Sequence, residues 1–164
     1  MIRKLIYLGI FAIIVSGATI GVIKLTQSRS IIPKDIKKQL NIVTLLPKSD
    51  QIIVDHHSFK YDSNAKVLTF VVSGFGIKNT ISEQATPDPI NDIPQYLDKL
   101  TESLHEYTSF DTAAGKVYLT RPEELKGDQS AVMNSKGVLM FAHPEKDLTD
   151  DQWRQFFNSL DVIR

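Results

Sequence analysis

The stretch from Lys66 to Gln84, KVLTFVVSGFGIKNTISEQ, alternates apolar and polar residues on both sides of a phenylalanine that two glycines flank. Side chains of a strand point alternately to opposite faces, so this period of two predicts a strand in each half. The apolar residues that share one face of the first half are Leu68, Phe70 and Val72. Gly74-Phe75-Gly76 between the halves is typical of a turn. The stretch therefore predicts an antiparallel hairpin with Phe75 at its tip.

Four other runs predict strands: Ile52 to Phe59, Lys116 to Thr120, Ser130 to Met133 and Val138 to His143. Two amphipathic segments predict helices, each with its apolar residues three or four positions apart. The stripe of the first helix consists of Ile93, Leu97, Leu100, Leu104 and Tyr107, and that of the second of Trp153, Phe156, Phe157 and Leu160. Thr149, followed three residues later by Gln152, forms a capping-box pattern at the start of the second helix.

These elements follow one another in the order three strands, helix, three strands, helix. Short turns between strands favour antiparallel pairing, and both helical stripes need a sheet face to cover. We therefore expect an α+β fold, with an antiparallel sheet of about six strands and two helices packed on one of its faces. Residues 49–164 would form this domain, after an N-terminal transmembrane helix in residues 1–25 and a linker with a short helical lead-in in residues 26–48.

The transmembrane prediction comes from Leu5 to Ile23, an apolar run without a charged residue. A helix of this length spans about 28 Å, close to the thickness of a bilayer's hydrocarbon core. The basic start, Arg3 and Lys4, resembles a signal peptide, and cleavage near Ser16 is an alternative. The run is longer than a usual signal core, which favours an uncleaved anchor in contact with the lipid bilayer.

Two arguments about orientation conflict. Lysines and an arginine follow the anchor at Lys24, Arg29, Lys34, Lys37 and Lys38, and the positive-inside rule then places the domain in the cytoplasm. The signal-like start favours the opposite side of the membrane. We expect an extracytoplasmic domain. Within the anchor, Gly17 and Gly21 have the spacing at which two membrane helices approach closely, which makes weak self-association possible.

The composition excludes several classes of function. There is no cysteine, so disulfides, thiolate metal sites, cysteine nucleophiles and lipid-modified cysteines are absent. Lys and Arg total 19, and Asp and Glu also total 19, so the chain has no excess of positive charge that would favour binding of nucleic acid.

No pattern of residues predicts a catalytic, metal or cofactor site. His56 and His57 are adjacent in an expected strand and would point to opposite faces, so they would not share one ion. Phe75 is the residue we expect to contact a partner or the membrane, because a ring at a hairpin tip has little reason to be buried.

The layout resembles that of small single-pass membrane-anchored proteins of bacteria, including candidate Saccharibacteria. The segments that carry this resemblance are the anchor, Ile32-Pro33-Lys34, Ser58-Phe59-Lys60, Lys66 to Ser73, Gly115-Lys116-Val117-Tyr118 and Thr149 to Leu160. More distantly, the chain is similar to domains of Gram-positive surface proteins that are compared with lipoprotein carriers and anti-sigma-factor regulators. The resemblance implies an extracytoplasmic, non-catalytic module, and it assigns no site residue.

We therefore expect a membrane-anchored binding or interaction module for envelope proteins, cell-wall material or an apolar ligand, and no enzyme or cofactor. Two alternatives remain open. One is a membrane-tethered enzyme whose catalytic groups meet only in the fold, for example around His57 or His143. The other is a structural subunit that associates through its anchor.

Overall fold

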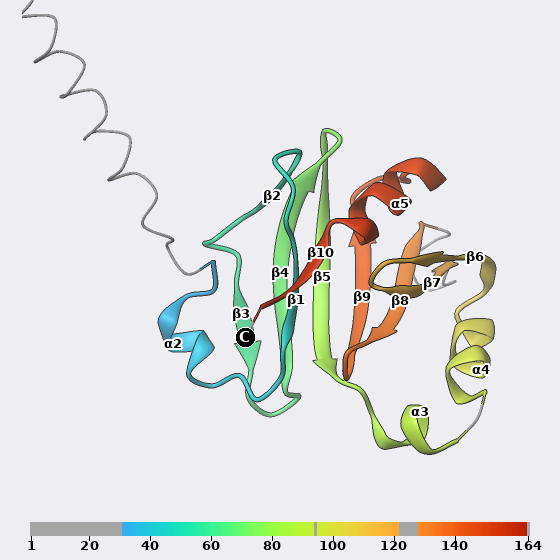
Figure 1. Cartoon of the computed structure of the whole chain (residues 1–164), viewed down its shortest axis with the longest axis horizontal. Helices are drawn as coiled ribbons and strands as arrows, with labels where there is room; N and C mark the ends of the chain where they lie inside the picture. The colour runs from blue at the N-terminus through green and yellow to red at the C-terminus, as the bar shows by residue number, and fades with distance from the viewer. Residues whose placement is uncertain (1–30, 94, 122–127, 164) are drawn as a thin grey trace, which may run out of the picture. The chain divides into compact units, whose positions relative to one another are not determined.

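The computed structural model describes residues 31–93, 95–121 and 128–163 (Figure 1). Residues 32–164 form one compact unit. The predicted anchor Leu5 to Ile23 lies outside the described residues, as do Gly17 and Gly21 within it. Within the described ranges, no helix has both the length and the apolar character needed to cross a membrane.

One large antiparallel sheet dominates the fold, with the strand order β2-β4-β5-β9-β8-β7-β6 (Figure 1). The eighth strand, β3, pairs with β4 on the same side as β2. The strands of this sheet are β2 (Ile52–Val54), β3 (Lys60–Asp62), β4 (Val67–Gly74), β5 (Ile77–Ala85), β6 (Glu106–Thr112), β7 (Gly115–Thr120), β8 (Ser130–Ser135) and β9 (Val138–Pro144). A separate two-stranded ribbon joins β1 (Thr44–Pro47) to β10 (Leu160–Ile163). The helices are α2 (Lys34–Lys37), α3 (Asp88–Asp92), α4 (Tyr96–Ser103) and α5 (Asp150–Asn158).

The predicted α+β fold class is wrong, because the described part of the chain is mostly β-sheet. Strands take up 46% of these residues and helices 21%, and the main sheet has eight strands where about six were expected. The predicted first helix stops early: α4 ends at Ser103, His105 has a left-handed backbone, and β6 begins at Glu106. Residues from Leu160 onward pair with β1 as a strand instead of extending the second helix.

The two helices do not pack on one face, contrary to the prediction. Residues paired across neighbouring strands lie on the same face of the sheet. Val72 pairs with Asn79, and Asn79 pairs with Pro144 of β9. The pairings of β9 with β8 and of β8 with β7 place Val117 on this face as well. We call this side the core face. Phe156 of α5 lies beside Val72 and Asn79, so α5 covers the core face. Tyr118 points to the other face, and its hydroxyl donates to Asp98 of α4 at 3.0 Å. α4 therefore covers the opposite face.

The second helix is otherwise as predicted. Thr149 Oγ1 accepts from the Gln152 N–H at 3.3 Å, and Gln152 Oε1 accepts from the Thr149 N–H at 2.9 Å, which confirms the capping box. Trp153, Phe156 and Phe157 are buried and pack ring against ring. Aromatic burial of this kind stabilises the contact with the sheet by about 2 kcal/mol per side chain.

The β1–β10 ribbon also lies on the core face, where a buried carboxyl holds it. Glu83 is 0% exposed and follows Ile81 on the inward side of β5. The Leu45 N–H of β1 donates to Glu83 Oε1 at 3.1 Å and to Oε2 at 3.3 Å. Burial raises the pKa of Glu83 from 4.5 to about 8, while the Leu45 hydrogen bond acts in the other direction. The carboxyl is therefore mostly protonated at neutral pH.

Glu83→Gln tests this protonation. Between pH 4.5 and 8 the folded protein keeps a proton that the unfolded chain releases, so the free energy of unfolding falls as the pH rises through this range. The full effect amounts to about 4 to 5 kcal/mol. Urea unfolding of the full chain in mild detergent at pH 5, 7 and 9 should show that Glu83→Gln removes most of this fall. Glu145→Gln, the same change at an exposed carboxylate, should leave it unchanged. Parallel pH profiles for Glu83→Gln and the parent would contradict the assignment.

Candidate binding site at the hairpin tip

The tip between β4 and β5 is a two-residue turn, since Gly74 pairs with Ile77. Phe75 has φ 56° and Gly76 has φ 74°, the two left-handed residues of a type I′ turn. The β8–β9 hairpin turns in the same way at Lys136 (φ 53°) and Gly137 (φ 78°). Glycine takes this conformation freely, but a residue with a Cβ pays about 1 to 2 kcal/mol. Asparagine is the preferred first residue of such a turn, so the turn itself does not account for the phenylalanine.

A small cavity lies beside the hairpin tip. Its volume is about 10 Å³, close to that of one water molecule. It is lined by Ile52, Val72, Gly74, Phe75, Ile77, Asn79, Leu148 and Phe156. Leu148 and Phe156 come from the segment around α5, so the cavity lies where the tip meets the helix that covers the core face. We call it the Asn79 cavity.

Asn79 is the polar member of this lining. Its side chain is 4% exposed, and neither Oδ1 nor Nδ2 has a hydrogen-bond partner among the described residues. An unpaired polar group in a protein interior costs about 1 to 3 kcal/mol. Nearly all buried polar groups are paired, so this one needs an explanation. Its only signal in the sequence is an amide at an inward position of β5.

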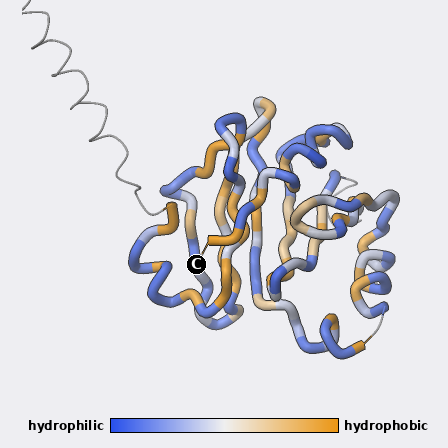
Figure 2. The backbone as a smooth tube through the Cα atoms, viewed as in Figure 1, coloured by the Kyte–Doolittle hydropathy of each residue, from blue (hydrophilic) through white to orange (hydrophobic). Residues whose placement is uncertain are grey.

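An open groove lies on the outer side of the same tip, with a volume of about 440 Å³. It is lined by Gln51, Ile53, Ser73, Gly74, Phe75, Gly76, Ile77, Lys78 and Glu145. Ile53 of β2 is 67% exposed, and Figure 2 shows the tip of the β4–β5 hairpin on the apolar side of the scale. Phe75 is half-buried and lines both the groove and the Asn79 cavity. The structure thus brings Phe75, the predicted contact residue, together with Asn79 and Ile53, which the sequence analysis did not single out.

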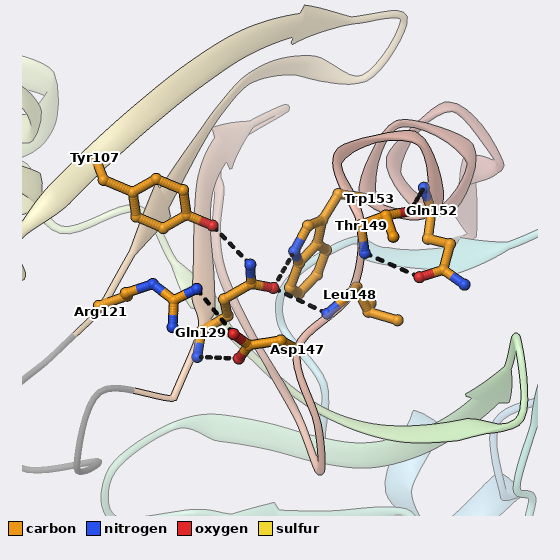
Figure 3. Close-up of polar contacts among 8 residues, drawn as sticks. All are labelled: Tyr107, Arg121, Gln129, Asp147, Leu148, Thr149, Gln152 and Trp153. Carbon is orange, nitrogen blue, oxygen red and sulfur yellow. Dashed lines mark hydrogen bonds and ion pairs between the residues drawn. The ribbon is translucent and has the colours of Figure 1, made fainter.

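A second polar cluster, centred on Gln129, is fully paired (Figure 3). Gln129 Oε1 accepts from Trp153 Nε1 and from the Leu148 N–H, both at 2.9 Å, and its Nε2 donates to the Tyr107 hydroxyl at 2.8 Å. The Gln129 N–H donates to Asp147, which also accepts from Arg121 at 2.8 Å. Because the Oε1, Nε2 and N–H groups of Gln129 each have a partner, this residue joins β6 and α5 to the start of β8.

The histidines do not form a common site. The predicted strand Ile52 to Phe59 breaks after Val54, and His56 and His57 lie exposed in the turn that follows. His143 Nδ1 is 3.1 Å from the Ser130 hydroxyl across the β8–β9 ladder. A hydroxyl–imidazole pair needs a third group that orients the base before it resembles a hydrolytic site, and the described residues supply none to His143. In the described part of the chain no group of three His, Cys, Asp or Glu residues could hold a metal ion.

Comparisons of the chain with protein-family models, with curated proteins and with solved structures find no match. The candidate site therefore depends on the geometry of the hairpin tip alone.

Gln129→Ala should lower the free energy of unfolding by about 2 to 4 kcal/mol, because it leaves the buried Trp153 Nε1 and Leu148 N–H unpaired. Arg121→Ala serves as the comparison within the same cluster. Its ion pair with Asp147 is between two half-exposed side chains, and its loss should cost less than about 1 kcal/mol. Urea unfolding of both variants measures the difference, and equal destabilisation would show that the cluster does not act through Gln129.

Proposed function

We propose that the protein is a single-pass membrane protein whose β-rich domain is a non-catalytic binding module on the extracytoplasmic side, with the hairpin tip as its contact surface. The observation that carries the proposal is Phe75. This residue stands at a strained position of a turn that asparagine would fit better, and it lines both a groove and a cavity. A ring held there at an energetic cost, next to the exposed Ile53, supports contact with a partner.

The other polar clusters of the described residues support binding over catalysis. The side-chain groups of Gln129 are paired within the domain, and the described residues supply no orienting group to the Ser130–His143 pair. The partner we propose is an envelope protein or cell-wall material, since an anchored domain outside the cytoplasm meets these first.

A photo-crosslinking amino acid at Ile53 tests the contact surface in the protein's own membrane. We expect an adduct from this position and none from a crosslinker at Asp92, an exposed residue of α3. The adduct should disappear in Phe75→Asn, which retains a favourable Asn-Gly turn while it removes the ring. Lys136→Asn makes the same turn change in the β8–β9 hairpin and should leave the adduct intact. An adduct that persists in Phe75→Asn would refute the tip as the contact surface.

Proteolysis of intact cells tests the orientation. If the anchor Leu5 to Ile23 holds the domain outside the cytoplasm, added protease should remove the domain while a cytoplasmic marker protein survives. The chain itself should stay with the membrane fraction after alkaline carbonate washing. Protection of the domain in intact cells, with digestion after lysis, would reverse the orientation in favour of the cations that follow the anchor.

A further inference from the structure

The short helix α2 presents its lysines away from the domain. Ile36 is its buried residue, and Lys38 follows the helix with helical backbone angles. Because a helix turns by about 100° per residue, Lys34 and Lys38 each lie about 160° from Ile36 and are neighbours on the outer surface. Lys37 is also exposed, at about 100° from Ile36. Three lysines and one aspartate, Asp35, give residues 34–38 a net charge of +2.

The domain does not offset these charges. None of the described residues forms an ion pair with Lys34, Lys37 or Lys38. Lys34 is the first residue of α2, where the helix dipole disfavours a cation. Lys34 and Lys38 also repel each other, because like charges four residues apart destabilise a helix. The arrangement therefore costs α2 stability unless an anion outside the domain offsets it.

The position of α2 in the chain indicates where such an anion is found. α2 is the first described helix after the proposed anchor, and Ile32, two residues before it, is buried at 3% exposure. Seven residues, Lys24 to Ser30, separate the end of the apolar run at Ile23 from the first described residue. A chain of seven residues spans at most about 25 Å when fully extended. An anchor at Leu5 to Ile23 therefore keeps α2 within reach of the lipid headgroups.

We propose that Lys34, Lys37 and Lys38 rest on anionic lipid headgroups of the bilayer that holds the anchor. The phosphate groups of these lipids supply the negative charge that the domain does not, and lysines next to a membrane anchor are attracted to such a surface. The inference rests on the anchor of the proposed function and not on the hairpin tip. It goes beyond that function because it assigns a second contact surface, which fixes the side of the domain that faces the membrane.

The distance from α2 to the headgroups tests the inference in the full chain. The chain has no cysteine, so Asn41→Cys, just after α2, carries a fluorescent label at one defined place. Ser103→Cys places the same label on α4, which Figure 1 shows at the other end of the large sheet. Each labelled chain is inserted into nanodiscs of phosphatidylcholine, alone or mixed equally with phosphatidylglycerol. A nitroxide on the lipid headgroups quenches a label that lies close to them.

We expect the label at position 41 to be quenched at least about threefold more strongly in the anionic nanodiscs than in the neutral ones. The label at position 103 should be quenched weakly in both. Added NaCl should remove the difference at position 41, because salt screens exposed charges. Inorganic phosphate at the same ionic strength should do no more than NaCl, and greater relief by phosphate would show a site for free phosphate instead of a lipid contact.

Two double variants provide the matched comparison. Lys34→Glu with Lys38→Glu reverses both outward charges of α2 and should lower the quenching at position 41 to its value in neutral nanodiscs. Lys99→Glu with Lys146→Glu makes the same change in charge at exposed lysines on α4 and before α5, and should leave the quenching unchanged.

Equal quenching at position 41 in the two kinds of nanodisc would overturn the inference, as would equal losses in the two double variants. Neither result bears on the hairpin tip. An adduct at Ile53 that depends on Phe75 would then leave the proposed contact surface standing without the lipid contact.

Discussion

The apolar core face runs across the large sheet from β2 to β6, and covering this face is the constraint on which the remaining structure depends. The sheet cannot cover it alone, because all its strands lie in one layer. The cover comes from two elements that follow or precede the sheet in the chain. One is the aromatic stripe of α5, and the other is the ribbon in which Thr44 of β1 pairs with Ile163 of β10. Both ends of the β-rich domain are therefore used to bury its core.

This constraint explains which features the sequence could predict. The hairpin of β4 and β5 was visible because both strands are long and the turn between them is local. The cap and the aromatic stripe of α5 were visible for the same reason. β1, β3 and β10 have three or four residues each, too few to establish a period of two. β2 was predicted, but as part of the longer run Ile52 to Phe59, of which only Ile52–Val54 forms the strand. The partner of β1 also lies more than a hundred residues away in sequence, where no local pattern can indicate it.

The predicted fold class failed at the boundary between helix and strand. Leu104 and Tyr107 continue the spacing of a helical stripe, but the left-handed backbone at His105 ends the helix and starts β6. The predicted placement of both helices on one face failed for a related reason. α4 buries a threonine and makes a polar contact to Tyr118, so it does not compete with α5 for the core face. The spacing of apolar residues predicts that a helix packs on a sheet, but it does not predict which face of the sheet the helix covers.

The candidate site was predictable only in part. Phe75 could be singled out because the turn around it is local. The burial of Asn79 depends on Leu148 and Phe156, which lie about 70 residues further on in the chain.

Asn79 and Glu83 are two buried polar residues of the same strand that differ in whether the domain supplies a hydrogen-bond partner. Both point from β5 to the core face, and both are nearly inaccessible to solvent. Glu83 finds its partner within the domain, in the N–H of Leu45, and the contact holds the ribbon to the sheet. Asn79 lies where the cover of α5 ends and the tip begins, and its amide has no such partner. Burial costs both groups their contact with water, so an internal partner makes the first a structural device. The second has no such partner among the described residues, so the cost of its burial is not offset within this part of the domain.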